Sequence, residues 1–332
     1  MSRPAVLFAR DRFTAELTWT DLAGLLPGWT IRSCPSGQLA GYLDGIDVIC
    51  PLGSRVDADL LTAGEFGLVQ QFGVGLEKVD LAAAAERGVW AARVPGDATG
   101  NADSVAELAV LLLLALVRRL DEVRDALTGR RWAVRPTGGS LAGSTVAIVG
   151  LGAIGAALAT RLAPFGVRLL AVRAHPERGG PPGLEFLTGP ENLAGVLSRA
   201  DAVVCAAMFE GGQPPLFDAA AFGAMRPGAL FVNVARGGLV DEAALLAALE
   251  SGQLGAAALD VYATEPADPD WPLLRHPRVL ATPHVGGLTH EMFRRTGEAF
   301  AANLRRWAAG QPPWWAANQP APGVLRRPPA AT

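Results

Sequence analysis

The feature that most constrains the fold of this chain is a glycine-rich turn between an apolar run and a helical pattern. Residues 146–149 lead into Gly150, Gly152 and Gly155, spaced as G-x-G-x-x-G, and apolar residues then recur at helical spacing. The first glycine permits a sharp turn, the second lets backbone approach a pyrophosphate, and the third lets helix and strand pack closely. The strand-turn-helix context predicts a dinucleotide site, although a plain tight turn can carry the same letters.

The next predicted strand, residues 167–172, bears on the choice of cofactor. An NAD site usually has an acidic residue about twenty positions beyond the glycines. This strand ends instead in Arg173, with no Asp or Glu beside it. Because an arginine suits the additional phosphate of NADP, we favour NADP over NAD. The alternative is that Arg173 is a solvated loop residue.

Length and composition indicate a protein of about two domains. The 332 residues carry a formal net charge of −3, which gives no basic footprint for nucleic acid. The three cysteines are widely spaced and form neither a disulfide framework nor a metal-binding knuckle, so we expect no metal and a cytoplasmic location. No signal peptide is expected, and the most apolar stretch, residues 108–117, is too short to span a membrane and is interpreted as a buried helix.

Strands and helices alternate along most of the chain, which predicts parallel sheets with helices on both faces. The expected strands are residues 6–9, 48–50, 68–72, 89–92, 146–149, 167–172, 202–205, 230–234, 256–261 and 279–282. The expected helices include residues 80–87, 191–199, 241–250 and one long helix over 101–127. The Pro- and Ala-rich residues from 311 end in a stretch that we expect to be disordered beyond about residue 320.

A second glycine turn lies in the first hundred residues. Gly73, Val74 and Gly75 directly follow a predicted strand, and their amides can face an anion such as a substrate carboxylate. A tight turn without a ligand is an equally good interpretation.

Three chemically distinctive residues follow successive strands of the second half. Arg236 follows residues 230–234, Glu265 follows 256–261 and His284 follows 279–282. Ligands of doubly wound sheets bind at the carboxyl ends of the strands. Reduction of a 2-keto acid needs a cation for the carboxylate and a proton donor at the carbonyl, and a neighbouring carboxylate favours a protonated histidine. The plainer alternatives are a helix-capping arginine, a surface acid and a buried structural histidine.

The segments around these residues resemble a known family. Residues 222–242, residues 259–262 with Glu265 and Pro266, and residues 282–287 are similar to the D-isomer-specific 2-hydroxyacid dehydrogenases. Together with the two glycine turns, the resemblance covers most of the chain.

This resemblance implies roles for individual residues. His284 would be the acid/base, Glu265 its partner and Arg236 a substrate ligand, while the amides of Val74 and Gly75 would hold the substrate carboxylate. The implied cofactor contacts are Gly150, Gly152, Ala153, Ile154, Gly155, Arg173, Ala206, Ala235, Asp260 and Ser104, with Asp260 and residues 101–104 near the nicotinamide.

The resemblance also implies an α/β fold of two doubly wound parallel-sheet domains. Residues 1–102 and 287–332 would form a discontinuous, flavodoxin-like substrate domain to which a helix over residues 291–308 returns. Residues 103–286 would form the inserted Rossmann-like dinucleotide-binding domain, through which the family usually forms homodimers.

The implied activity is reversible, NAD(P)-dependent reduction of a small 2-keto acid to its D-2-hydroxy acid. The alternatives are a phosphite-type anion dehydrogenase and a non-catalytic, cofactor-sensing regulatory protein. The chain departs from the family after the third cofactor-domain strand: the family often has a histidine and a proline there, whereas this chain has residues 206–209 and then the unusual residues 210–215. Which acid is used depends on loops with no readable code.

Overall fold

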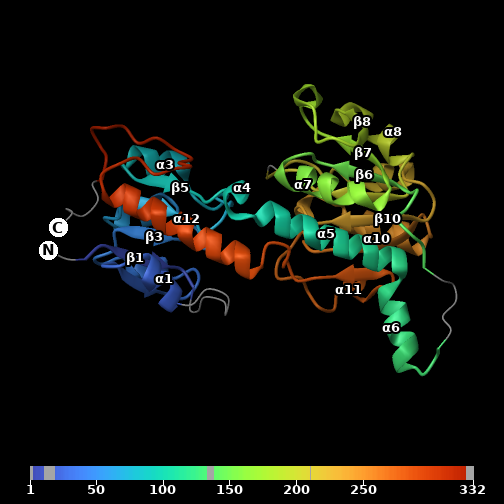
Figure 1. The fold of residues 1–332 in the computed structure, drawn as a ribbon. Helices are drawn as coiled ribbons and strands as arrows, with labels where there is room; N and C mark the ends of the chain where they lie inside the picture. Colours follow the sequence, from blue (N-terminus) through green and yellow to red (C-terminus); the bar gives the residue numbers. More distant parts are fainter. Residues whose placement is uncertain (1–2, 11–18, 133–137, 210, 327–332) are drawn as a thin grey trace. The chain divides into compact units, whose positions relative to one another are not determined.

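The computed structural model describes residues 3–10, 19–132, 138–209 and 211–326 (Figure 1). The chain divides into two compact units, Met1–Gly100 with Leu288–Thr332 and Asn101–Gly287. Each contains one sheet in which all strand pairs are parallel, so the predicted fold class is confirmed.

The sheet of the first unit has the strand order β2-β1-β3-β4-β5, which is the flavodoxin-like order. Its strands are β1 (Ala5–Phe8), β2 (Thr30–Ser33), β3 (Val48–Cys50), β4 (Leu68–Gln70) and β5 (Trp90–Ala92). Its helices are α1 (Trp19–Leu25), the 3-10 helix η1 (Leu39–Tyr42), α2 (Ala58–Ala63), α3 (Leu81–Glu86), α4 (Gly96–Thr99) and α12 (His290–Ala308).

Successive residues of β1 point to opposite faces of this sheet. In β1, Phe8 packs with Phe300 of α12, and the ring centroids are 5.4 Å apart. Leu7 belongs to the cluster on the other face, with residues of α2 and α3. The unit therefore has two apolar layers, as expected of a parallel sheet that helices cover on both sides.

The segment after α12 is bound to the first unit. Ala316 pairs with Ala92 of the edge strand β5, and the side chain of Asn318 accepts a hydrogen bond from the amide of Ala91 at 2.8 Å. Arg326 donates to the carbonyl oxygens of Leu61, Gly64 and Phe66. The prediction of disorder beyond about residue 320 is therefore wrong for residues 321–326, because backbone and side-chain hydrogen bonds compensate for the sparse apolar residues; residues 327–332 lie outside the described residues.

The sheet of the second unit has the order β12-β11-β10-β9-β6-β7-β8, the Rossmann order with one further strand. Its strands are β6 (Thr145–Val149), β7 (Arg168–Val172), β8 (Leu184–Thr188), β9 (Ala202–Cys205), β10 (Ala229–Asn233), β11 (Leu254–Leu259) and β12 (Val279–Ala281). Its α-helices are α5 (Asn101–Arg118), α6 (Leu120–Thr128), α7 (Ala153–Leu162), α8 (Leu193–Leu197), α9 (Ala219–Ala224), α10 (Glu242–Glu250) and α11 (Pro272–Arg275). Its 3-10 helices are η2 (Ala163–Phe165), η3 (Pro176–Arg178), η4 (Pro190–Asn192) and η5 (Gly237–Leu239).

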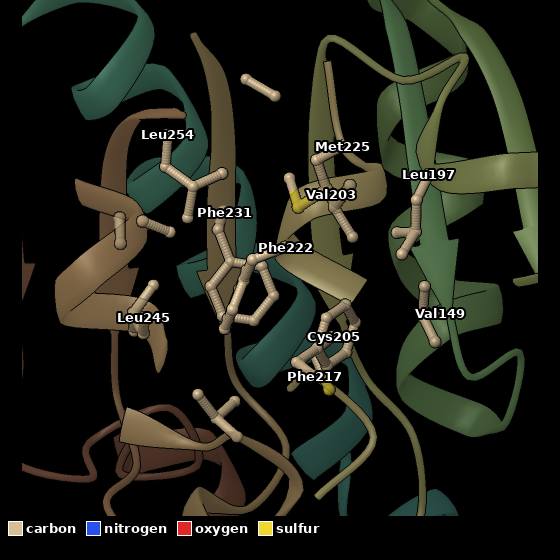
Figure 2. Packing of buried hydrophobic residues seen from close by; sticks show 14 of the residues in the cluster. Val149, Leu197, Val203, Cys205, Phe217, Phe222, Met225, Phe231, Leu245 and Leu254 are labelled. Carbon is tan, nitrogen blue, oxygen red and sulfur yellow. The ribbon is translucent and has the colours of Figure 1, made fainter. Parts of the chain in front are cut away.

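This sheet also separates two apolar layers. Ile148 of β6 faces the cluster that contains α5 and α7, whereas Val149 faces the cluster shown in Figure 2. In that second cluster, Phe231 of β10 packs with Phe217 and Phe222, at ring-centroid distances of 4.8 and 5.3 Å. This packing fixes the strands whose carboxyl ends carry the candidate site.

The prediction of one long helix over residues 101–127 is wrong. The helix breaks at Arg119, which has a left-handed backbone with φ 53°, so α5 and α6 run in different directions (Figure 1). The amide of Arg119 bonds to the carbonyl of Leu116, and its guanidinium pairs with Glu122. Left-handed backbone is unfavourable for residues other than glycine, so the apolar pattern gave no sign of the break.

Two strands were missed, and both lie at sheet edges. β2 and β8 consist mostly of partly or fully exposed residues and lack the apolar runs that mark the central strands. Their sequences therefore resemble loops.

Residues 108–117, the most apolar stretch of the sequence, lie on the helix α5, and one face of this helix is buried, as predicted. Ala106, Ala109 and Leu113 on it are fully buried in the core of the second unit. Throughout the described ranges, no helix has both the length and the apolar character needed to cross a membrane.

Candidate active site

The three glycines of the turn after β6 differ in the space around them. A β-carbon at Gly150 would lie 2.3 Å from the backbone of Ala207, and one at Gly155 would lie 2.1 Å from the carbonyl oxygen of Gly150. A β-carbon at Gly152 would meet nothing within 4 Å. Two glycines are therefore required by close packing and the third leaves backbone open, which fits a bound pyrophosphate.

The turn leads into an anion-binding helix end. Gly152 is the N-cap of α7 and no side chain caps this helix, whose first residues are Ala153 and Ile154. Exposed amides and the helix dipole at such an end favour a phosphate. Ala206, after the neighbouring strand β9, donates its amide to the carbonyl of Val149 at 2.8 Å. The turn thus lies where the strand order reverses, which is the usual nucleotide position of this fold.

Arg173 directly follows β7, as predicted. Its amide bonds to the carbonyl of Thr188 at 3.0 Å, and its guanidinium donates to the carbonyl of Gly179. His175 and Arg178 lie in the same loop, and His175 is 3.3 Å from Glu177. The loop after β7 therefore carries two arginines, Arg173 and Arg178, together with the carboxylate of Glu177.

Arg236 lies at the carboxyl end of β10 and is exposed. The preceding backbone is fixed by the fully buried Asn233, whose side chain accepts from the amide of Ala235 at 3.0 Å and donates to the carbonyl of Arg236 at 3.1 Å. One guanidinium N–H of Arg236 bonds to the carbonyl of Ala235 at 2.8 Å. The rigid backbone leaves a planar cation at the strand end that can bind a carboxylate through two N–H groups.

Glu265 and His284 form a pair between the loops after β11 and β12. Glu265 Oε2 lies 2.7 Å from His284 Nδ1, and 46% of the His284 side chain is exposed. A carboxylate on Nδ1 orients the ring and leaves Nε2 for a substrate. The structure thus brings these two predicted residues into contact, with the geometry of an oriented acid/base.

The loop of His284 is tied to the buried Asp260. One Asp260 oxygen accepts from the hydroxyl of Thr282 at 2.6 Å and the amide of Val285 at 2.8 Å, while the other accepts from the amide of Gly286 at 2.8 Å. His284 itself has a left-handed backbone, φ 54°. Asp260 therefore holds both sides of an unfavourable backbone conformation, and its predicted contact with nicotinamide stays a prediction.

Two further residues, Tyr262 and Glu242, fix the loop after β11, and the sequence analysis missed both. The amide of Tyr262 donates to Glu265 Oε1 at 3.0 Å, and Glu242 of α10 accepts from the amide of Ala263 at 2.8 Å. Burial raises the pKa of Glu242, which the bond from Ala263 partly offsets. No motif identifies these contacts; the one signal available was that Tyr262 lies three positions before the candidate catalytic carboxylate Glu265.

The helix α5 begins beside the His284 loop. A β-carbon at Gly287 would lie 2.2 Å from Asn101 Oδ1, and one at Gly286 would lie 3.4 Å from Val105 and 2.9 Å from Asp260. Ser104 lies on this first part of α5. The predicted nicotinamide contacts Ser104 and Asp260 are therefore on segments that pack near each other.

Comparison with protein families shows the family to which the chain belongs. The family model for D-isomer specific 2-hydroxyacid dehydrogenases, NAD binding domain, matches residues 110–286. The chain belongs to the D-isomer specific 2-hydroxyacid dehydrogenase family. The matched residues lie within the second unit.

Individual relatives agree with this family. The chain is 39% identical over 262 residues to a D-3-phosphoglycerate dehydrogenase of Mycobacterium leprae, covering 78% of this chain and 48% of that protein. It is 35% identical over 269 residues to a glyoxylate reductase/hydroxypyruvate reductase of Mus musculus, covering 79% and 80%. The chain thus spans about half the length of the D-3-phosphoglycerate dehydrogenase that it matches.

A solved structure shares the fold. It is an NADPH-dependent glyoxylate/hydroxypyruvate reductase of Sinorhizobium meliloti in complex with NADP and malonate, with a TM-score of 0.79 and 29% identity. The likeness covers 95% of this chain and 97% of that one.

The loop after β9, where the sequence departs from the family pattern, exposes a large apolar side chain. Met208 in this loop is 84% exposed. The ring of Phe209 fills the space above Gly238, where a β-carbon would lie 2.5 Å from the ring. The loop is therefore packed against the Arg236 turn through an aromatic ring.

The other predicted substrate residues lie in the first unit. Val74 is partly exposed in the turn after β4, and Gly73 has φ 146°. A β-carbon at Gly75 would lie 2.6 Å from the carboxylate of Glu77, so a side chain there would require the flexible Glu77 side chain to shift. The predicted role of Val74 and Gly75 in carboxylate binding stays a prediction.

A separate cavity of about 450 Å³ lies at the amino edge of the second unit's sheet. Its wall includes Ser144, Ala202, Gly255 and Val279, each at or next to the start of a strand. Gly150, Ala206, Asp260 and His284 follow the opposite ends of these four strands.

Proposed function

We propose that this chain is an NAD(P)-dependent dehydrogenase that reversibly reduces a small 2-keto acid to its D-2-hydroxy acid. The observation that carries the proposal is the Glu265–His284 contact of 2.7 Å at a strand end of the NAD binding domain. Family membership supports this activity, and both a D-3-phosphoglycerate dehydrogenase and a glyoxylate reductase/hydroxypyruvate reductase are among the relatives. The comparisons do not support a phosphite-type dehydrogenase or a non-catalytic sensor.

In the proposed reaction, each strand-end residue has one task. His284 donates a proton from Nε2 to the carbonyl oxygen of the keto acid, and Glu265 holds the ring through Nδ1. Arg236 binds the substrate, for which a planar guanidinium and a carboxylate are complementary. The nicotinamide, when bound, supplies the hydride. In the reverse direction His284 takes the hydroxyl proton.

We assign the dinucleotide to the turn after β6. Gly150 and Gly155 shape this turn, Gly152 lets the backbone approach the pyrophosphate, and Ala153 and Ile154 offer the first helical amides. Ala206, Ala235, Asp260 and Ser104 would complete the cofactor contacts.

NADP is the proposed cofactor. Arg173 follows β7 where an NAD site usually has an acid, and Arg178 is a second arginine in the same loop. The solved relative from Sinorhizobium meliloti is NADPH-dependent and is in complex with NADP. Tighter binding of NADH than of NADPH would overturn this preference.

The activity test measures the loss of reduced-nicotinamide absorbance with glyoxylate, hydroxypyruvate, pyruvate and larger aromatic keto acids, each with NADH and NADPH. D-3-phosphoglycerate is tested with the oxidised cofactors. We expect turnover with at least one of these acids and faster reaction with NADPH. Cofactor binding without turnover of any acid would contradict the proposed reaction.

We also propose that the protein is a homodimer formed through the second unit. Leu111 of α5 and Leu120 and Leu127 of α6 are exposed apolar residues, and neighbouring Trp132 is 91% exposed. Such a surface is typical of protein interfaces. Light scattering should give twice the chain mass of 34.5 kDa, and a monomer at micromolar concentration would contradict the dimer.

A further inference from the structure

Tyr262 contacts both loops that present the acid/base pair. Its hydroxyl lies 2.8 Å from the carbonyl oxygen of Thr282 and 3.2 Å from that of Leu259. Its amide donates to Glu265 Oε1 at 3.0 Å, and the other oxygen of Glu265 faces His284. A single buried residue thus touches the partner carboxylate directly and the histidine loop through its phenol.

The carbonyl of Thr282 is the point through which the phenol acts on His284. It also accepts the amide of His284 at 3.0 Å, so this carbonyl and the His284 backbone form a tight turn. Left-handed backbone is unfavourable at a residue other than glycine, so the surrounding contacts must maintain it. The phenol is the second donor to the carbonyl that anchors this conformation.

The surroundings of the phenol keep it a neutral donor. Burial raises the pKa of Tyr262 to about 12, and the nearby carboxylates of Asp260, Glu265 and Glu242 contribute in the same direction. The hydroxyl therefore keeps its proton at neutral pH and well above it. Its one proton can go to only one of the two carbonyls, and the shorter contact is the one to Thr282.

We propose that Tyr262 is a positioning residue that keeps the Glu265 carboxylate and the His284 ring in contact with each other. The inference rests on the proposed function, because it gives the pair its acid/base task. Tyr262 acts through Thr282 and Glu265 and has no assigned contact with substrate or cofactor. The ring itself packs in the core of the second unit, so only its hydroxyl and amide serve the pair.

The test replaces the hydroxyl and keeps the ring. The Tyr262→Phe variant should lower kcat about 5- to 10-fold, the effect of losing one hydrogen bond, with the KM for NADPH unchanged. The chain has one other tyrosine, Tyr42 of η1 in the first unit, and Tyr42→Phe is the matched control. Circular dichroism and NADPH binding confirm that both variants fold.

A second measurement does not depend on turnover. Nitrogen-15 spectra of the four histidines report which ring nitrogen carries the proton, and a His284→Gln variant identifies the His284 signals. The Glu265 contact favours the neutral ring protonated at Nδ1, and Tyr262→Phe should reduce the share of this tautomer relative to Tyr42→Phe. A fall in kcat with this change supports the positioning role.

The remaining outcomes separate the two proposals. Spectra and kcat that match the Tyr42→Phe control overturn the positioning role, as does a fall in kcat with an unchanged tautomer. If the wild-type protein reduces no keto acid, the proposed function fails; a changed tautomer in Tyr262→Phe would still support the positioning of the ring.

Discussion

The two sheets of this protein use their buried polar side chains differently. In the second unit, Asn233 and Asp260 are buried and bind the loops of Arg236 and His284 at the carboxyl ends of strands. In the first unit, Gln70 and Asn303 are fully buried and meet at 2.5 Å, and Asn303 also binds the backbone of Trp314. One set shapes the proposed site and the other fastens the segment after α12.

This difference shows what a doubly wound sheet needs in order to carry acid/base chemistry. Unpaired polar groups are costly to bury, so each buried side chain must have a partner. In the second unit those partners belong to the loops that present the functional side chains, and the loops are therefore fixed. In the first unit, the buried side chains of Gln70 and Asn303 instead hold the segment after α12. The turn at Val74 has backbone amides that could bind an anion.

The largest expected effect is that of removing the acid/base. His284→Ala should lower kcat about 1,000-fold, because a positioned proton donor contributes 100- to 10,000-fold, while NADPH binding changes little. His276→Ala is the control, since His276 precedes β12 at the opposite edge of the same sheet. Steady-state assays and fluorescence titration measure the two quantities, and unchanged turnover would refute the assignment.

Changing Arg236 should have the next largest effect. Arg236→Lys keeps the charge but loses the planar fork, and we expect a rise in KM for the keto acid, a fall in kcat and a combined loss in kcat/KM of about 100-fold. Arg226→Lys, in which the arginine pairs with Asp201 at the amino edge, should leave both constants unchanged. Equal kinetics for the two variants would remove Arg236 from the site.

Matched asparagine substitutions compare the two units directly. Asn303→Ala and Asn233→Ala should each lower the free energy of unfolding by about 2 kcal/mol, because each leaves buried groups without a partner. Only Asn233→Ala should also lower kcat by more than the smaller fraction of folded protein explains. Urea unfolding gives the stabilities and NADPH titration checks the cofactor site, which Asn303→Ala should leave intact. Loss of NADPH binding in Asn303→Ala would break the proposed division between the sheets.

The smallest effect concerns pH and Glu242. Burial raises its pKa in the folded protein, so the folded state holds the proton more tightly than the unfolded state, and stability falls as pH rises through that pKa. Glu242→Gln should therefore raise Tm by no more than about 2 °C at pH 7, with the difference vanishing as the glutamate becomes protonated in acid. The predicted sign of this Tm difference would be wrong if Glu242→Gln had a lower Tm than wild type at pH 7 and the same Tm in acid. Glu242→Ala, which removes the acceptor for Ala263, is the contrasting variant.

Much of the candidate site could be predicted because its residues stand directly after apolar strands. The turn from Gly150 to Gly155, Arg236, Glu265 and His284 all follow runs whose burial the sequence reveals. The contacts that position them could not be predicted, since the bond from Tyr262 to Thr282 depends on the register of β11 with β12. That register places residues twenty positions apart within hydrogen-bond distance.

The central part of the fold could be predicted from the sequence, but its edges and its helix break could not. Central strands and the topology follow from alternating apolar segments, whereas the edge strands β2 and β8 lack such runs. The break at Arg119 depends on a backbone conformation that favours glycine, and nothing in the local sequence signals it. The ordered residues 321–326 depend on hydrogen bonds to distant backbone, such as those of Arg326, which composition does not reveal.

Hydrogen–deuterium exchange with and without NADPH tests most directly the claim that the carboxyl edge of the second sheet holds the cofactor. We expect slowed exchange of the amides in residues 150–156, 206–208 and 234–237, with further slowing around residues 260–265 and 282–286. Protection confined to the amino-edge cavity around Ser144 and Val279, or to the first unit, would contradict it.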